Sequence, residues 1–167
     1  SDAGLKILGA IGDMYSVAVA VQSDKAYVAE YNSGFETYNV SDPTKPTSYG
    51  KWISDKVLLA PFMVGEYMAC PVFGENELRF YEVKDILHPQ LVTTANIRVG
   101  SYTYNAPYLY YTTDYALLTC NLTDIHNPVQ ESQITLSQKS NFMFRQGDTL
   151  IVWDTMGNNK GFDLYSL

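Results

Sequence analysis

Aromatic and acidic residues stand side by side at four places where the sequence passes from a β-favouring run into a turn. The aromatic residues are Tyr31, Phe73, Tyr115 and Trp153, and the acids beside them are Glu30, Glu75, Asp114 and Asp154. Exposed aromatic rings favour contacts with proteins or sugars, because each ring offers a large apolar surface with a polar or charged neighbour at hand. A ring in such a place therefore predicts a binding surface.

Two further residues, Trp52 and Arg98, fall in connections that we expect at the same end of the fold. We predict that one loop face binds a protein or a glycan through a set of six residues: Tyr31, Phe73, Arg98, Tyr115, Trp153 and Asp154. Packing of the same rings between neighbouring sheets is the simpler interpretation, and the sequence leaves it open.

The sequence contains none of the common motifs of a catalytic centre. It has no Gly-x-Ser-x-Gly elbow, no phosphate-binding P-loop and no Gly-x-Gly-x-x-Gly. We therefore expect a non-enzymatic protein without a cofactor. Two alternatives stay open: a hydrolase or lyase that uses isolated acids with Arg98 or Arg145 at a central channel, and a structural part of a larger surface protein.

The metal-binding residue types are too sparse for a metal site. The two cysteines, Cys70 and Cys120, are far apart in the sequence and form no Cys-x-x-Cys pair. We expect both as buried free thiols, and we expect His88 and His126 in surface turns. Residues 154–160 lack the alternating acids and the closing Glu of a calcium loop, so we read them as a loop between strands.

The elements that must position these residues repeat along the chain about every 42 residues, a period typical of repeat architectures. Three copies share a hydrophobic residue, any residue, Asp, three residues and Pro, and a fourth copy stops before the Asp; the copies are 34–46, 77–89, 116–128 and 161–167. Because an Asp carboxylate can accept hydrogen bonds from backbone N–H groups two residues on, we expect Asp42, Asp85 and Asp124 to stabilise turns. Asn39 and Asn121 begin glycosylation sequons at one repeat position, so we assign both to the repeat pattern.

Each repeat contains four β-favouring runs separated by turn residues. The second run of each repeat gives a further landmark; its copies are Tyr27–Glu30, Tyr67–Cys70, Tyr108–Tyr111 and Leu150–Trp153. Four short strands in 40 to 50 residues are typical of a propeller blade. We predict one all-β domain over residues 1–167, a β-propeller of about four blades with repeats at 12–53, 54–97, 98–136 and 137–167.

The ends of the chain are out of phase with the repeat. Residues 5–11 occupy the place of a fourth strand, whereas the last repeat stops after its third strand, so we expect the two ends to complete one blade and hide both open edges. The alternative is half of a larger ring, completed by self-association, by another chain or by further sequence. Because residue 1 is Ser, we also expect a processed form or a piece of a longer protein.

The first repeat resembles the LVIVD-repeat family. The resemblance rests on Ala26–Ala29 and on residues 34–46, which read Gly-Phe-Glu-Thr-Tyr-Asn-Val-Ser-Asp-Pro-Thr-Lys-Pro. It implies a β-propeller of the kind found in bacterial and archaeal surface or secreted proteins, and hence a place outside the cytoplasm. The second and third copies lack the Pro after Asp. The family shares no catalytic set, so the resemblance implies no active-site residue.

Composition excludes several classes of protein. The 167 residues are 46% hydrophobic and only 17% charged, which excludes an intrinsically disordered chain. With 11 Lys and Arg against 18 Asp and Glu, the net charge is −7, so we expect no nucleic-acid partner. No apolar run approaches the roughly 20 residues that span a bilayer, so we expect no membrane span.

Overall fold

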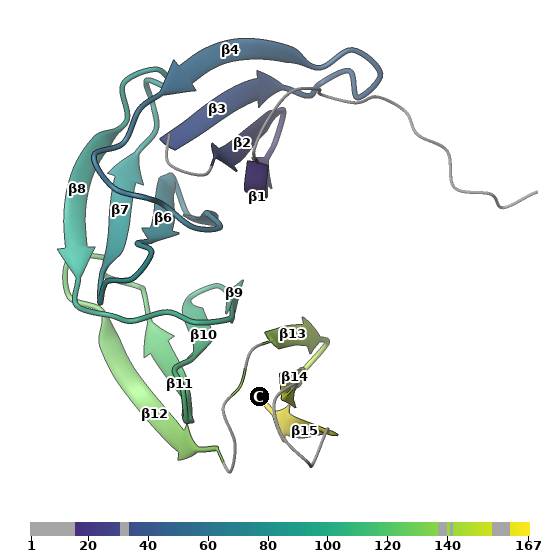
Figure 1. Ribbon diagram of the computed structural model, residues 1–167, viewed down its shortest axis with the longest axis vertical. Coiled ribbons are helices and arrows are strands. Elements are labelled where there is room, and N and C mark those ends of the chain that lie inside the picture. The colour runs from purple at the N-terminus through teal and green to yellow at the C-terminus, as the bar shows by residue number, and fades with distance from the viewer. Residues whose placement is uncertain (1–15, 31–33, 137–139, 141, 155–160) are drawn as a thin grey trace, which may run out of the picture. The chain divides into compact units, whose positions relative to one another are not determined.

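Every regular element among the described residues of the computed structural model is a β-strand, which confirms the all-β fold class (Figure 1). The structure describes residues 16–30, 34–136, 140, 142–154 and 161–167. It divides into two compact units: unit 1 comprises Ser1–Gly74 and Arg79–Val92, and unit 2 comprises Glu75–Leu78 and Thr93–Leu167. None of the described residues belongs to a helix long and apolar enough to cross a membrane.

In the described part of the chain, fifteen strands form four antiparallel sheets, and in each sheet the strands lie side by side in sequence order. The first sheet contains β1 (Ser16–Gln22), β2 (Lys25–Glu30), β3 (Gly34–Asn39) and β4 (Thr47–Trp52), and the second contains β5 (Phe62–Val64), β6 (Tyr67–Pro71), β7 (Leu78–Glu82) and β8 (Gln90–Ala95). The third sheet contains β9 (Tyr102–Asn105), β10 (Tyr108–Thr112), β11 (Ala116–Asn121) and β12 (Val129–Thr135), and the fourth contains β13 (Phe142–Gln146), β14 (Thr149–Asp154) and β15 (Gly161–Ser166).

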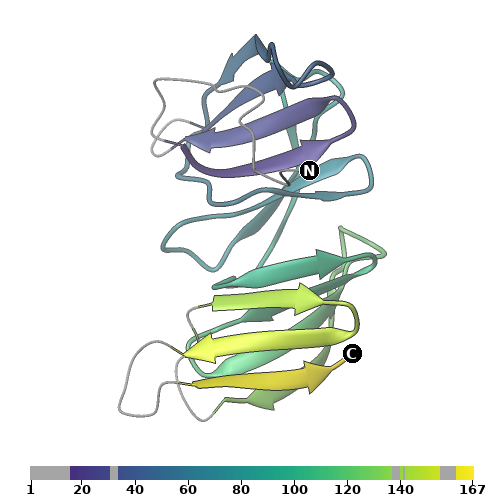
Figure 2. The same cartoon turned by 90° about the vertical axis from the view of Figure 1, so that its right-hand side faces the viewer.

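The fourth sheet has three strands among the described residues. The predicted strand 5–11, which we expected to complete it, lies outside them. Unit 1 holds the first sheet and most of the second, and unit 2 holds the third and the fourth (Figures 1 and 2).

Two-residue turns join the first and second strands of every sheet and define which positions are equivalent. The pairs that close these turns are Gln22↔Lys25, Val64↔Tyr67, Asn105↔Tyr108 and Gln146↔Thr149. Ser23, Gly65 and Gly147 open three of the turns with positive φ angles of 55°, 60° and 58°, the left-handed conformation that such hairpin turns require. Lys25 is therefore equivalent to Tyr67, Tyr108 and Thr149.

This register corrects the alignment that the sequence suggested for the second landmark. Alignment by residue type made Tyr27 equivalent to Tyr67, Tyr108 and Leu150. Alignment by the turns makes Tyr27 equivalent to Ala69, Tyr110 and Ile151. In the fourth copy the error is one residue. A shift of one residue in a strand moves each side chain to the opposite face of the sheet.

The core of unit 1 lies between one face of the first sheet and one face of the second. Tyr27, Ala29 and Phe35 come from the first sheet, and Met68, Cys70, Tyr81 and Val83 come from the second, all in one buried cluster. Trp52 stacks on Phe35 with ring centroids 5.9 Å apart and meets Tyr81 edge-on at 5.0 Å. Trp52, which the sequence placed in a connection between sheets, is thus a packing residue at the junction of the two sheets, the interpretation that the sequence had left open.

The core of unit 2 is built in the same way from the third and fourth sheets. Tyr110 and Leu117 from the third sheet cluster with Met143, Leu150 and Val152 from the fourth. Burying one such aliphatic side chain contributes about 1.5 to 3 kcal/mol to stability. One buried face on each sheet therefore holds each unit together.

Both cysteines are buried free thiols, as the sequence predicted. Cys70 lies on β6 and Cys120 on β11. Burial raises the pKa of the Cys70 thiol well above its ordinary value, and burial together with Glu131 raises that of Cys120 to about 11. Because the thiolate is the reactive form, both cysteines are unreactive and serve as packing residues.

The repeated aspartates stabilise turns, as predicted. Each carboxylate accepts a hydrogen bond from the backbone N–H group two residues later. The distances are 2.9 Å from Thr44 to Asp42, 3.1 Å from Leu87 to Asp85 and 2.9 Å from His126 to Asp124. His88 and His126 are exposed in these turns, and His88 Nδ1 lies 2.9 Å from Asp85. The carboxylates therefore serve the scaffold.

The sequon asparagines at the ends of β3 and β11 bond in the same way. The side-chain oxygens of Asn39 and Asn121 accept the N–H groups of Ser41 and Thr123, each at 2.9 Å. This shared bond explains the repeated Asn without glycosylation, in line with its assignment to the repeat pattern.

We expect Asp124→Ala to lower the unfolding midpoint and Asp124→Asn to preserve most of it, because an Asn side chain makes the same bond at Asn39 and Asn121. The Asn127 amide and the His126 N–H lower the pKa of Asp124. The extra stability of wild type over Asp124→Asn is therefore fully present above the ordinary carboxyl pKa. It is lost as pH falls through the lower pKa that Asp124 has in the folded state. Thermal unfolding of both variants from neutral to acid pH measures this; equal destabilisation by Ala and Asn would contradict it.

Candidate binding surface at the loop ends of the sheets

In unit 2, the connection before β9 and the loop after β10 lie at one end of the third sheet. Gly100 donates its N–H to the carbonyl of Thr112 at 2.8 Å, and Thr112 donates to the carbonyl of Ser101 at 2.9 Å. The N–H of Met143, at the start of β13, donates to the Ser101 hydroxyl at 2.8 Å and ties the fourth sheet to the same end. We call residues 96–101 and 113–115 the loop end of unit 2.

Tyr115 is an exposed ring on a well-fixed backbone. Its side chain is 60% exposed. Its carbonyl accepts the N–H of Leu136 at 2.8 Å, and two residues earlier in the loop the Thr113 N–H donates to the carbonyl of Ala116 at 2.9 Å. The ring therefore does not pack between sheets, and its backbone is ordered before any partner binds.

Arg98 lies at the same end of the third sheet, exposed in the connection after β8. Two residues later the chain passes so close to β10 that a Cβ on Gly100 would lie 2.7 Å from the carbonyl oxygen of Thr112. This close approach fixes the connection that carries Arg98. Tyr115 and Arg98 are thus an aromatic ring and a cation at one end of a rigid sheet.

Trp153 belongs to a sheet face rather than to a loop. It lies in β14, paired with Phe142 on one side and Phe162 on the other, and is 50% exposed. Asp154 is the last residue of β14, and its side chain lies outside the described part, as do Tyr31 and residues 155–160. The roles assigned to Tyr31 and Asp154 stay predictions.

In unit 1, Phe73 follows β6 and is 58% exposed. Its N–H donates to the carbonyl of Val57 at 2.9 Å, and the N–H of Leu59 donates to Pro71 at 2.8 Å. These bonds hold the Phe73 backbone beside the connection that joins β4 to β5. We call residues 53–57 and 72–74 the loop end of unit 1.

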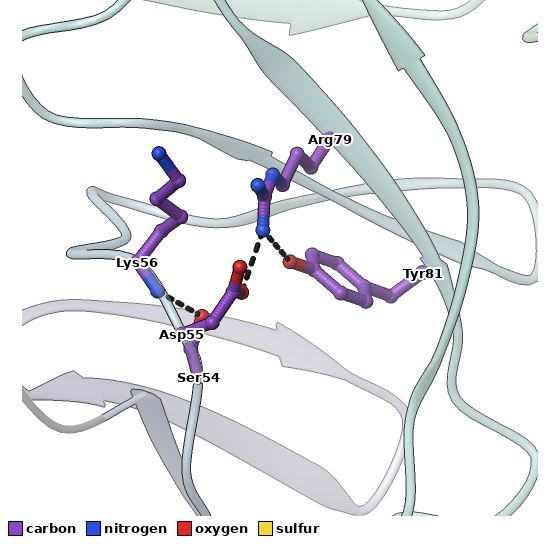
Figure 3. A network of polar contacts seen from close by, with 5 residues as sticks. All are labelled: Ser54, Asp55, Lys56, Arg79 and Tyr81. Carbon is purple, nitrogen blue, oxygen red and sulfur yellow. Dashed lines mark hydrogen bonds and ion pairs between the residues drawn. The ribbon is translucent and has the colours of Figure 1, made fainter.

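A buried arginine, which the sequence analysis missed, anchors this connection (Figure 3). Arg79 projects from β7, is 8% exposed and donates from Nη1 to Asp55 at 2.7 Å and to the Tyr81 hydroxyl at 3.4 Å. In the same connection the Lys56 N–H donates to the Ser54 hydroxyl at 3.1 Å. The guanidinium thus reaches from the sheet to the loop and fixes the segment beside Phe73.

The charges in this network perturb one another. The hydrogen bond from Arg79 lowers the pKa of Asp55, whose side chain is nevertheless 71% exposed. Burial raises the pKa of Tyr81, although Arg79 and Ser54 oppose the increase. Asp55 therefore stays ionised and faces solvent at the loop end.

Glu30, an acid that we placed beside Tyr31, is instead buried and paired with Lys51. Arg145, one of the two arginines considered for a catalytic role, lies on β13 with Nη2 3.8 Å from Asp148. Within the described ranges, no group of three or more His, Cys, Asp or Glu side chains is arranged to hold a metal ion.

A tyrosine-lined groove in unit 2 also escaped the sequence analysis. Its volume is about 270 Å³, and its walls include Tyr108, Tyr110, Glu131, Leu150 and Tyr165. Its walls come from β10, β11 and β12 of the third sheet and from β14 and the end of β15 of the fourth. Tyr110, Leu117 and Leu150 of these walls belong to the core cluster of unit 2, so we treat the groove as an edge of that core and not as a ligand site.

The chain was compared with known families, curated proteins and solved structures. No family model and no curated protein matches it. The computationally designed Ika4 protein matches 98% of this chain over 99% of its own, at 4% identity and a TM-score of 0.61. A functionally unknown protein from Desulfotomaculum acetoxidans matches 93% at 9% identity and a TM-score of 0.69, and Kluyveromyces lactis Hsv2 matches 92% at 11% identity and a TM-score of 0.59.

These similarities show the fold alone. The chain has a β-propeller fold with four blades, one for each sheet, as the repeat predicted. It spans about half the length of the Desulfotomaculum and Kluyveromyces proteins, 52% and 50%.

We expect Asp55→Ala to lower the free energy of unfolding by about 0.5 to 1.5 kcal/mol, because Arg79 loses a charge-assisted bond whose acceptor is largely solvated. The loss should shrink as pH falls through the lowered pKa of Asp55, since wild type then loses the same bond. Urea unfolding at neutral and acid pH measures both effects. Asp24→Ala, which removes an exposed pair with Lys25 at 3.4 Å, is the control; an equal effect of the two variants would contradict the anchoring role.

Proposed function

We propose that this protein is a non-enzymatic binding module that recognises a protein or a glycan through the loop ends of its sheets. The observation that carries the proposal is a pair of exposed rings, Phe73 and Tyr115, on backbones already fixed by hydrogen bonds. Because the loops are ordered in advance, little conformational entropy is lost when a partner binds.

The surroundings of the two rings support the same function. Asp55 and Lys56 lie in the connection held beside Phe73, and Arg98 lies at the same end of its sheet as Tyr115. Aromatic residues and Arg are enriched in interface cores, with polar and charged groups around them. The two rings therefore match the composition of a recognition surface, in each unit separately.

We further propose that the chain is a divergent member of the LVIVD-repeat propellers and acts outside the cytoplasm. The support is the motif at Ala26–Ala29 and 34–46, together with the four-bladed fold. A repeat scaffold that binds a partner, and that brings no set of catalytic residues together, fits this assignment.

The test uses two defined probes, a glycan array and a phage-displayed random peptide library, against wild type, Phe73→Ala and Tyr115→Ala. We expect one probe set to yield binders whose affinity falls about tenfold or more when the ring of one unit, Phe73 or Tyr115, is removed. Tyr49→Ala is the matched control, since Tyr49 is a 39% exposed aromatic residue on β4. Its binding should equal that of wild type.

Two results would count against the function. One is the absence of binders from both probe sets, and the other is a set of binders that are indifferent to Phe73 and Tyr115.

A further inference from the structure

Each sheet has two faces, and the register defines them consistently. We call the face that carries Tyr27, Ala29 and Phe35 the forward face, because in unit 1 it packs on the next sheet in sequence. The opposite face, which packs on the preceding sheet in sequence, is the backward face. In unit 2, Tyr110 and Leu117 on the forward face of the third sheet pack on Leu150 and Val152 on the backward face of the fourth.

The fourth sheet exposes its forward face. Trp153 is equivalent to Ala29 and Phe162 is equivalent to Phe35, since the two pairs stand opposite each other in the same register. Ala29 and Phe35 are 0% and 2% exposed, whereas Trp153 and Phe162 are 50% and 63% exposed. Large neighbours on the same face are exposed as well; they are Phe142, Phe144 and Leu164.

This face is open in unit 2. Figure 2 shows β13–β15 toward the viewer with no other strand of unit 2 in front. A contiguous apolar patch of this kind marks an interaction site in a folded protein. The forward face of the third sheet, by contrast, is buried and forms part of the core of unit 2.

The first sheet exposes part of its backward face. Val19 pairs with Val28 as Met143 pairs with Val152, so Val19 and Met143 are equivalent. Met143 is 7% exposed, whereas Val17, Val19 and Val21 on β1 are 49%, 58% and 61% exposed. On the same face, Ala26, Val28 and Tyr38 of β2 and β3 are buried. The uncovered part of this face is therefore its first strand, β1.

We propose that a second copy of this chain covers these two faces: the forward face of the fourth sheet in one copy packs on the backward face of the first sheet in the other. The contact continues the sheet-on-sheet packing that each unit already contains. Bulky rings on one face meet short β-branched side chains on the other, a combination that packs without voids.

A closed pair of chains leaves neither face open. Because each copy carries one forward and one backward face, two copies related by a two-fold axis make the contact twice. Two of the structures with a similar fold are about twice as long, since this chain spans 52% and 50% of the Desulfotomaculum and Kluyveromyces proteins, whereas it spans 99% of Ika4. The proposal does not depend on the binding function of the loop ends.

The test is the mass in solution by light scattering and sedimentation, up to about 100 µM. We expect a particle of twice 18.8 kDa. Phe162→Glu and Val19→Glu should each weaken the association about 30-fold or more, because each places a charge in a buried contact. Val129→Glu, at a 57% exposed position on β12, is the control and should remain a dimer; circular dichroism confirms that each variant is folded.

A mixture of the two variants tests the pairing itself. The Phe162→Glu chain keeps its backward face and the Val19→Glu chain keeps its forward face. A mixed pair therefore has one intact contact and one contact that carries both substitutions, so the mixture should associate more strongly than either variant alone, although less strongly than wild type. A monomeric wild type would overturn the proposal. A dimer that tolerates both substitutions, or one that is broken only by Phe162→Glu, would overturn it too.

Discussion

Burial of one sheet face against the next is the interaction on which the structure of each unit depends. In unit 1, Trp52 of the first sheet stands between Phe35 of its own sheet and Tyr81 of the second. In unit 2, the third and fourth sheets meet through Leu117 and Leu150. Each sheet is short and would be marginal alone, so its stability comes from the neighbour that it covers.

The candidate binding residues depend on this packing. Once a sheet face is buried, the strand ends are fixed. Individual hydrogen bonds, such as those from Arg79 to Asp55 and from Gly100 to Thr112, then hold the connections against the strands. Phe73 and Tyr115 then project from ordered loops, although they add little to the core. Stability is thus concentrated on the sheet faces, and the proposed recognition surface lies at the sheet ends.

The sequence predicted what local chemistry decides. The turn aspartates, the buried thiols and the four β-favouring runs all follow from residue types within a few positions of one another. The sequence could not predict the bond between Arg79 and Asp55, which joins residues 24 positions apart. It also aligned Leu150 with Tyr27, because turn geometry, rather than residue type, decides which face a side chain takes.

A double-mutant cycle on Trp52 and Tyr81 measures the packing of two sheets most directly, because the rings come from different sheets with centroids 5.0 Å apart. The free energy of unfolding is measured for wild type, Trp52→Ala, Tyr81→Ala and the double variant. The account predicts a coupling energy of about 0.5 to 1.5 kcal/mol between the two rings. Additive effects, with a coupling indistinguishable from zero, would contradict it.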